Sequence, residues 1–337
     1  MRKTADVTRK GTGRVFMALW LAVAALLSSC EGALPVKPQS GGDPYEVVVM
    51  SDSKEMREML CGMLSRPVEG LPQQEPAFDV SPTRAEWTQA TRYARLTVIV
   101  KADGKTVGND WGRTSVRYER DAFARPQLIV QVEAPSVQAL HRDSTQVART
   151  VLRLLDHFEM KTAVSSMQRH RNAKAEDVIL RKMGCRVDIP EELTSMKVGK
   201  GFVWLSDNGG ESVSSICVYT HSLVPLDEEQ FLRMRDSVMA KNVPGERPGM
   251  YMTTERRIPL HIERHSRRTD GQNRTELCVR GLWQMRNDAM GGPFVSLSVV
   301  DSLRGRVITA EAFVYAPAGK KRNKLKRMEA ALQTLRF

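Results

Sequence analysis

A dense run of charged side chains is the first feature of the sequence with a chemistry of its own. Arg117, Glu119, Arg120, Asp121 and Arg125 follow one another closely, beside an apolar stretch that predicts a strand. Guanidinium groups bind carboxylates and phosphates through paired hydrogen bonds. The run therefore predicts either an anion-binding site or an ion-pair network, at a sheet edge or between two halves of the chain.

A second candidate is the sequence WQMRNDAMGGP, which starts at Trp283. We interpret it as a loop joining two strands, because Gly291 and Gly292 before a proline are typical of turns in which glycine takes a positive φ. Trp283 and Met290 would then line the mouth of a pocket, with Asp288 as a polar anchor. The alternative is a constrained hairpin turn whose tryptophan belongs to the core.

The remaining reactive side chains have no catalytic signature. The HExxH zinc motif is absent, and His261 and His265 fall in a predicted strand, where they would share a face at long range. Neither a G-x-S-x-G nucleophile elbow nor a Walker phosphate loop occurs. No metal or other cofactor is expected, and enzyme activity is an alternative that rests only on the many carboxylates.

The first thirty residues have the pattern of a targeting segment. Five basic residues and one acid precede an apolar run, residues 15–27, which is shorter than the roughly 20 residues that a membrane helix needs. A basic start, a short apolar run and small residues after it are typical of a signal peptide. The ending Leu27-Ser28-Ser29-Cys30 resembles the lipobox of lipoprotein signal peptides, and an ordinary secretory signal with an incidental cysteine is the alternative.

The lipobox resemblance implies cleavage before Cys30, acyl chains such as palmitate on that residue, and attachment to a membrane. Residues 1–29 would be the signal peptide. Residues 30–44 would be the lipidated cysteine and a flexible tether rich in Pro, Gly and Ser. Glu31-Gly32 differs from the inner-membrane retention signal, so we expect an outer-membrane anchor that faces the periplasm.

Composition is ordinary for a globular protein, with 41% hydrophobic and 27% charged residues. The net charge of +12 includes the basic residues of the predicted signal peptide. Another part lies near the C-terminus, in a cluster from Lys320 to Arg327. We interpret that cluster as the solvated face of a terminal helix, with attraction to anionic lipid headgroups as the alternative. No nucleic-acid partner is expected for an exported protein.

Four cysteines follow the predicted lipidation site. Cys61, Cys185, Cys217 and Cys278 lie mainly in apolar contexts, where a free cysteine behaves as a small buried hydrophobe. An oxidising compartment would nevertheless permit disulfides, and four cysteines allow three pairings. Cys217 with Cys278 is the favoured pair because both fall in predicted strands, and the disulfide state stays open.

The first half of the body, residues 45–184, predicts an α/β domain. Strands are expected at residues 45–50, 96–101 and 127–133, and helices at 55–64, 135–169 and 175–183. Ser81-Pro82 is typical of a helix start and predicts a further helix to about residue 93. Gly184 suits the position after a helix end and marks the predicted boundary.

The second half, residues 185–337, has a different pattern. Strands are expected at residues 202–205, 214–221, 258–265, 276–285, 294–300 and 306–316, and helices at 226–242 and 319–335. Consecutive strands without intervening helices pair in antiparallel fashion. The chain is thus predicted to be α+β in two halves, the second a twisted antiparallel sheet covered by helices.

Four stretches resemble a known family. They are VRYERDAFARPQLIV (116–130), MRDSVMAKNVPG (234–245), RGLWQMRNDAMGGPFVS (280–296) and FVYAPAGKKRN (313–323). With the lipobox, they resemble uncharacterised lipoproteins of Bacteroidetes-type bacteria, classed as a domain of unknown function, over about residues 45–337. This resemblance implies an envelope lipoprotein and no known activity. The element order of the second half also resembles the Mog1/PsbP-like fold, which mostly serves in binding or assembly.

These patterns favour a membrane-anchored envelope lipoprotein that binds another envelope component or assists its assembly. Its expected partners are the membrane, through lipid on Cys30, and another envelope protein. One alternative is an enzyme or carrier that acts on cell-wall or lipid material through the charged run or the Trp283 segment. Another is a purely structural lipoprotein.

Overall fold

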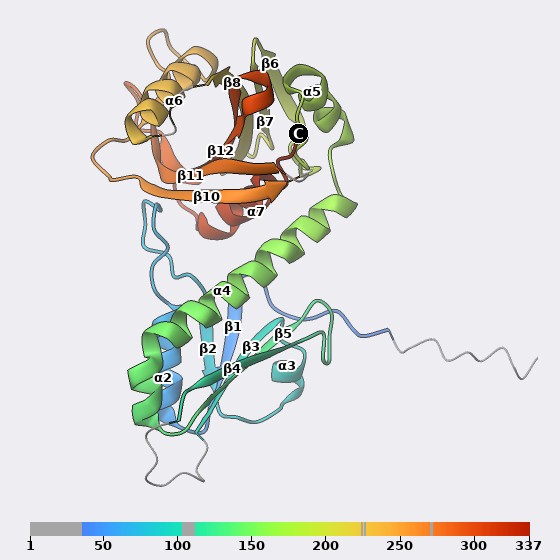
Figure 1. Cartoon of the computed structure of the whole chain (residues 1–337), viewed down its shortest axis with the longest axis vertical. Coiled ribbons are helices and arrows are strands. Elements are labelled where there is room, and N and C mark those ends of the chain that lie inside the picture. Colours follow the sequence, from blue (N-terminus) through green and yellow to red (C-terminus); the bar gives the residue numbers. More distant parts are fainter. Residues whose placement is uncertain (1–35, 103–111, 224, 226, 270–271) are drawn as a thin grey trace, which may run out of the picture.

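A long helix, α4 (Val137–Arg169), lies between two domains, each with its own sheet (Figure 1). This computed structural model describes residues 36–102, 112–223, 225, 227–269 and 272–337. Cys30 and the predicted signal peptide lie outside the described residues. Both domains mix helices and strands, so the predicted α+β class is confirmed.

The N-terminal sheet is mixed, with the strand order β2-β1-β3-β5-β4. Its strands are β1 (Glu46–Met50), β2 (Asp79–Thr83), β3 (Leu96–Ala102), β4 (Ser115–Arg120) and β5 (Leu128–Ala134). All neighbours pair in parallel except β4, which is antiparallel to β5 at one edge. Helices α2 (Lys54–Leu64) and α4 pack on one face, where apolar residues from both helices and the central strands form a single core.

The prediction of a helix that starts at Ser81-Pro82 is wrong. These residues lie in β2, which pairs only with β1 and forms the other edge of the sheet. Proline has no amide hydrogen to donate, and an edge strand leaves one side of its backbone unpaired, so Pro82 is tolerated there. The helix of this region is the short α3 (Gln89–Arg92). The side chain of Thr88 caps its N-terminus.

The C-terminal sheet is antiparallel and curled, with the order β10-β11-β12-β13-β8-β7-β6 and β9 paired to β11. Its strands are β6 (Ser195–Gly199), β7 (Phe202–Ser206), β8 (Val213–Ser222), β9 (Met252–Thr254), β10 (His261–Thr269), β11 (Gln272–Met285), β12 (Gly291–Asp301) and β13 (Arg306–Tyr315), with a 3-10 turn at Ser302–Arg304. Helix α6 (Glu228–Asn242) covers one face, and α5 (Ala173–Met183) and α7 (Arg322–Leu332) cover the other (Figure 1). The predicted twisted sheet covered by helices is confirmed.

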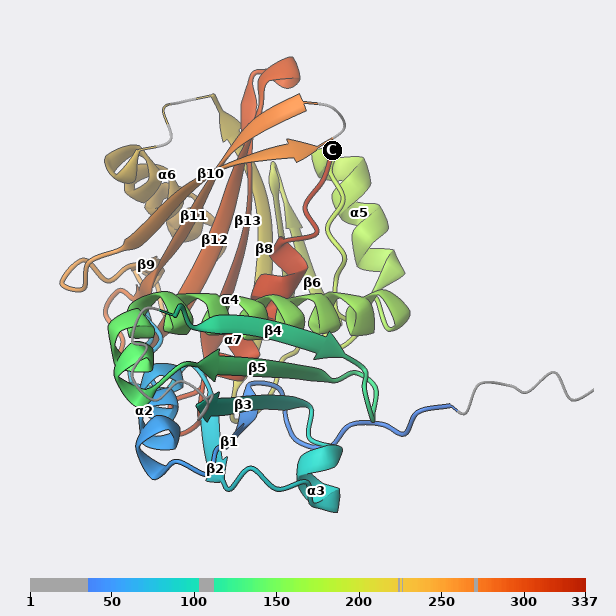
Figure 2. The same cartoon turned by 60° about the horizontal axis from the view of Figure 1, so that its bottom comes forward.

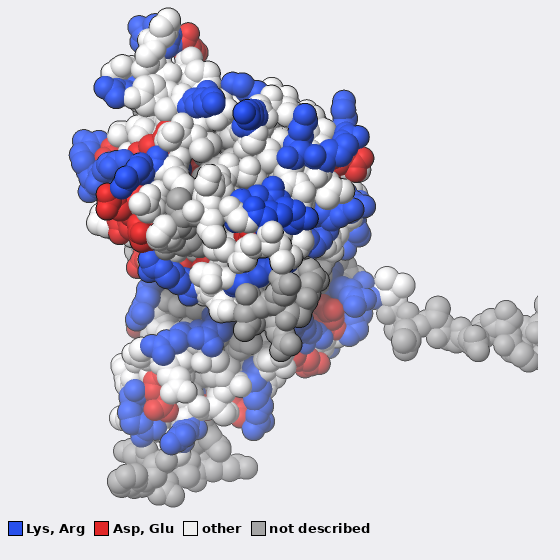
Figure 3. Space-filling model, turned by 45° about the horizontal axis from the view of Figure 1, so that its top comes forward, with Lys and Arg blue, Asp and Glu red and all other residues white. Residues whose placement is uncertain are grey.

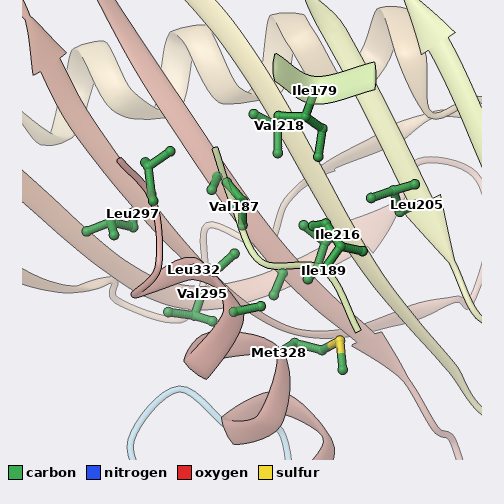
Figure 4. Packing of buried hydrophobic residues seen from close by; sticks show 14 of the residues in the cluster. Ile179, Val187, Ile189, Leu205, Ile216, Val218, Val295, Leu297, Met328 and Leu332 are labelled. Carbon is green, nitrogen blue, oxygen red and sulfur yellow. The ribbon is translucent and has the colours of Figure 1, made fainter. Parts of the chain in front are cut away.

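Aliphatic side chains from several elements meet beneath α5 and α7 (Figure 4). Ile179 of α5 and Leu332 of α7 pack with strand residues such as Ile216 and Leu297, and all four are at most 2% exposed. This core determines where the boundary between the two domains lies. Because α5 buries its apolar face here, the change falls near residue 170, at the end of α4, and Gly184 lies inside the second domain.

The basic cluster near the C-terminus joins the two domains. The backbone amides of Lys321 and Arg322 donate to the two carboxylate oxygens of Glu75, at 2.7 and 3.0 Å. The guanidinium of Arg322 also binds the carboxylate of Asp79 at 2.7 Å. Lys321 and Arg322 are only 2% exposed, so the interpretation of the whole cluster as a solvated helix face is wrong. Glu75 caps the start of α7 from the other domain.

Within the described ranges, no helix is both long and apolar enough to cross a membrane.

Candidate functional site

The charged residues of strand β4 divide between the two faces of the sheet. Residues opposite one another in an antiparallel pair point to the same side. Arg120 stands opposite Leu128, whose side chain lies in the core shared with α4. Arg117 and Glu119 occupy the alternate positions and point to the other face, where Arg117 pairs with Glu133 at 3.7 Å. The predicted single cluster is therefore split by the strand.

Asp121 and Arg125 belong to the turn that links β4 to β5. Asp121 has a positive φ of 53°, and its carboxylate accepts a hydrogen bond from Arg125 Nε at 3.1 Å and from the amide of Gln127 at 2.8 Å. Gln127 is fully buried and donates to the carbonyl oxygens of Arg92 and Ala94, both at 2.8 Å. These contacts hold the turn in place. Asp121 and Arg125 therefore form an ion pair, as the prediction of an ion-pair network expects, and are not both free to bind an anion.

Helix α4 runs alongside β4 (Figure 2) and completes a hollow of about 810 Å³, which we call the basic cleft. The helix contributes Lys161, Arg169 and two hydroxyl residues, while the buried ring of Phe158 lies at its floor. The complete lining is Lys37, Gln39, Arg120, Asp121, Arg125, Pro126, Phe158, Lys161, Thr162, Ser165 and Arg169. No local pattern in the sequence indicates that α4 brings its own cations to the β4 turn, because these residues are far apart in the chain.

The segment before β1 forms another wall of the cleft. The carbonyl of Pro38 accepts from the amide of Arg125 at 2.8 Å, and the amide of Ser40 donates to the carbonyl of Arg125 at 3.3 Å. The ammonium of Lys37 donates to the backbone carbonyl of Asp121. Residues 38–41 are therefore hydrogen-bonded to the N-terminal domain, which shortens the part of the segment 30–44 that can act as a tether.

The basic cleft carries more positive charge than its acids neutralise. Asp121 is its one acidic lining residue, and Arg125 already pairs with it. Among the described residues, no acidic side chain forms an ion pair with Arg120, Lys161 or Arg169. These three cations lie exposed around one hollow, which is the arrangement that binds anions.

A second hollow of about 500 Å³ continues from the basic cleft toward α7. It shares Arg169 and Thr162 with the cleft and adds Lys324 and Arg327. Its buried acid, Glu159, is held by Arg95 through two hydrogen bonds of 2.8 and 2.7 Å. This buried acid is thus already paired. The hollow has one other acidic residue in its lining, the exposed Asp43, so positive charge predominates here as well.

A third hollow, of about 820 Å³, lies between α4 and the strands β10 and β11. It contains both signs of charge, and its buried members are paired. Glu329 accepts a hydrogen bond from Arg280 at 2.8 Å and lies 3.8 Å from Lys326, which itself binds Asp156 at 2.8 Å. Burial alone would raise the pKa of Glu329, but Lys326 and Arg280 lower it below its ordinary value. The network holds the two domains together.

The structure places the Trp283 segment in a β-hairpin whose tryptophan belongs to the core, which is the second of the two interpretations given for it. Trp283 lies in β11 and Gly291 and Gly292 in β12, with Gly292 directly opposite Trp283. The tryptophan is 3% exposed and donates to the carbonyl of Val314 at 3.3 Å, so it is a core residue. Neither glycine has a positive φ; Asn287 does, in the actual turn, at 61°.

This segment needs glycine because backbone atoms of neighbouring residues lie too close to leave room for a side chain. A Cβ on Gly292 would overlap the carbonyl oxygen of Val314 on the next strand, and one on Gly291 would lie 2.9 Å from the carbonyl oxygen of Trp283. Met290 packs on the core beneath α6. Asp288 is exposed and accepts from the adjacent amide of Ala289 at 2.6 Å. These residues do not surround any of the three hollows.

The cysteines of the body are free. Cys217 packs in the core under α6, and Cys278 packs in the core on the opposite face of the sheet, so this favoured pair cannot form. Burial raises the pKa of the Cys278 thiol to about 11 and that of Cys185 to about 12. Such thiols are poor nucleophiles at neutral pH. Across the described residues, no group of His, Cys, Asp and Glu is arranged to hold a metal ion.

Comparison with protein families divides the chain in the same place as its two cores. Residues 172–334 match a domain of unknown function (DUF4837), and residues 40–168 match another domain of unknown function (DUF8532). The two matches meet between α4 and α5. The predicted resemblance to a domain of unknown function is confirmed, but two such families match where the sequence predicted a single family over about residues 45–337.

Comparison with other proteins adds little about function. No curated protein matches the sequence. The structure is weakly similar to that of a Mog1 mutant, with a TM-score of 0.27, 9% identity, and coverage of 45% of this chain and 89% of Mog1. It is also weakly similar to the Saccharomyces cerevisiae Ran-binding protein Mog1p, with a TM-score of 0.26, 10% identity, and coverage of 44% and 84%.

Proposed function

We propose that this chain is an envelope lipoprotein of Bacteroidetes-type bacteria, anchored by lipid on Cys30, that acts as a non-enzymatic binding module. The observation that carries the proposal is the place where the chain enters the folded body. Residues 38–41 are fixed beside the basic cleft, only a few residues after Cys30. A lipid on Cys30 would therefore keep this cleft close to the membrane. In our proposal this is the outer membrane, and the folded body lies in the periplasm.

Anchoring is tested by growing cells that express the full chain with radiolabelled palmitate. We expect label on the wild-type protein and recovery of the protein in the membrane fraction. The variant Cys30→Ala should carry no label and should leave that fraction. Labelled Cys30→Ala protein, or unlabelled wild type, would overturn the proposed anchor.

Binding to another envelope protein is tested by cross-linking intact envelopes, followed by affinity purification and mass spectrometry. Arg120→Gln/Arg169→Gln removes two cations from the cleft, and Arg149→Gln/Arg181→Gln removes two exposed cations elsewhere on α4 and α5. A partner lost only from the first variant would support an adaptor role at the cleft. A partner retained by both variants would place the interaction on another surface.

An enzyme or carrier acting on cell-wall or lipid material is the second candidate, favoured by one observation. The hollow between the domains brings His157, His265 and Glu276 to one cavity. Purified protein is assayed with peptidoglycan and phospholipid substrates, and any turnover is compared with that of Glu276→Gln. Turnover that this substitution abolishes, in a protein that still folds, would replace the binding-module proposal.

A further inference from the structure

The shape and groups of the basic cleft suit a phosphate. Arg120 and Arg169 each present a planar set of donors that can bind two phosphate oxygens at once, and Lys161 adds a compact positive charge. The hydroxyl of Thr162 is occupied, since it donates to the carbonyl of Phe158 at 2.8 Å, whereas Ser165 is exposed at the rim. A hollow of about 810 Å³ accepts a group of headgroup size.

The position of the cleft suits a phosphate on a membrane surface. Lys37, on its rim, follows Cys30 by seven residues, which span at most about 25 Å when fully extended. Lys and Arg side chains are attracted to anionic lipid only near the surface, within a Debye length of about 8–10 Å. A link of this length allows the cleft to come within that layer, while the anchor keeps the cleft no more than a few nanometres from it.

The lining argues against a protein as the main occupant. Phe158 and Pro126 are its apolar residues, and the other lining side chains are charged or polar. A stable protein interface needs an apolar, well-packed centre, which the cleft does not offer. A headgroup needs only charge and hydrogen-bond donors, and the acyl chains stay in the bilayer.

We propose that the basic cleft binds the phosphate of an anionic phospholipid headgroup in the membrane that carries the anchor. The proposal rests on the proposed lipid anchor, because the anchor determines which surface the cleft meets. In this arrangement the acyl chains on Cys30 hold the protein, and the cleft fixes the orientation of the N-terminal domain against the membrane.

General positive charge must be separated from the cleft, because Lys and Arg side chains also lie in several groups over the face of the C-terminal domain shown in Figure 3. Arg149→Gln/Arg181→Gln is the matched control for Arg120→Gln/Arg169→Gln, since both remove two charges from exposed side chains. Arg149 and Arg169 lie on the same helix, about 30 Å apart at 1.5 Å per residue.

The experiment is flotation of unlipidated protein, residues 31–337, with vesicles of phosphatidylcholine with or without phosphatidylglycerol. This chain keeps every described residue and both domain cores. We expect binding only to the anionic vesicles. Each lost cation should weaken it about fivefold, so Arg120→Gln/Arg169→Gln should weaken it about 25-fold and the control less than about twofold. Circular dichroism and thermal unfolding confirm that each variant folds.

A second arm measures binding of glycerol 1-phosphate and inorganic phosphate to the same proteins by calorimetry. Weak binding of these soluble phosphates that depends on Arg120 and Arg169, together with flotation, supports the proposal. Soluble phosphate binding without flotation would overturn the lipid as occupant. Equal losses in the cleft variant and the control would overturn the cleft as the site. Palmitate labelling at Cys30 is independent of both arms, so a failed anchor and a failed cleft are told apart.

Discussion

At the scale of single residues, Arg235 of α6 and Glu311 of β13 form an ion pair whose side chains are both fully buried. The guanidinium binds the carboxylate at 2.7 and 3.0 Å and donates to Thr254 at 2.8 Å. It also lies over the ring of Phe294, 3.8 Å from its centroid. Removing Arg235 leaves the carboxylate of Glu311 buried without a cationic partner, which is costly even where the intact pair contributes little.

We therefore expect Arg235→Met to lower the free energy of unfolding by about 3–5 kcal/mol in urea titration. Arg233→Met on the same helix is the control, because Arg233 is exposed and pairs with exposed Glu229. That change should cost about 0.5 kcal/mol or less. Equal effects of the two substitutions would show that the buried pair has no special weight.

The environment of Glu329 should make the free energy of unfolding depend on pH. Its pKa is below the ordinary value of 4.5, because Lys326 and Arg280 outweigh the effect of burial, which alone would raise it. The unfolded chain binds this proton more readily than the folded chain. Its stabilising contribution is thus fully present above about pH 4.5 and is lost as the pH falls through the lower, folded-state pKa.

The measurement is urea unfolding of wild type and Glu329→Gln from about pH 7 to about pH 3. The wild type should be the more stable protein at neutral pH, and the difference should shrink below the ordinary pKa of glutamate. A difference that stays constant down to the lowest pH would contradict the depressed pKa of Glu329.

At the scale of elements, the packing of β12 against β13 depends on Gly292. Replacing it with alanine would push a methyl group into the backbone carbonyl of Val314, so the two strands must separate. The ring of Trp283, whose Nε1 would lie 3.2 Å from the new carbon, would be crowded as well. We expect Gly292→Ala to destabilise the fold by about 1–3 kcal/mol in thermal or urea unfolding. Gly210→Ala is the control, because a Cβ there meets nothing within 4 Å. A fully stable Gly292→Ala would mean that the segment is not restricted by packing.

At the scale of the whole molecule, Glu75 couples the domains by capping α7. Two amide groups at the start of a helix are left without partners unless something accepts from them, and a carboxylate there also complements the helix dipole. Glu75 supplies this from the N-terminal domain at 2.7 and 3.0 Å. The domains should therefore unfold together while this contact is intact.

Glu75→Ala should lower stability by about 1–2 kcal/mol and broaden or divide the unfolding transition in calorimetry, because the C-terminal domain loses a cap that the other domain provides. Glu58→Ala is the control, since Glu58 is exposed on α2 and pairs with exposed Lys54. A single sharp transition in Glu75→Ala, as in wild type, would contradict the coupling role.

Local signals in the sequence predicted most elements correctly. Ser53 caps α2 and Asp227 caps α6 through hydrogen bonds to amides three residues ahead, and Gly184 ends α5 with φ of 62°. The strands of the second half and their antiparallel pairing also follow from apolar runs without intervening helices. These features depend on residues within one or two turns of each other, which is why the sequence is sufficient to predict them.

The sequence alone also supplies the lipobox-like ending at Cys30 and the charged run, but it could not say how the charges are used. That depends on which side chains share a face of a sheet and which distant helix lies beside them. The tertiary structure places Arg120 with Lys161 and Arg169, turns Arg117 away and buries Trp283. Pairing across the fold is decided by the packing of whole apolar faces, so contacts between residues far apart in the chain appear only once the two cores have formed.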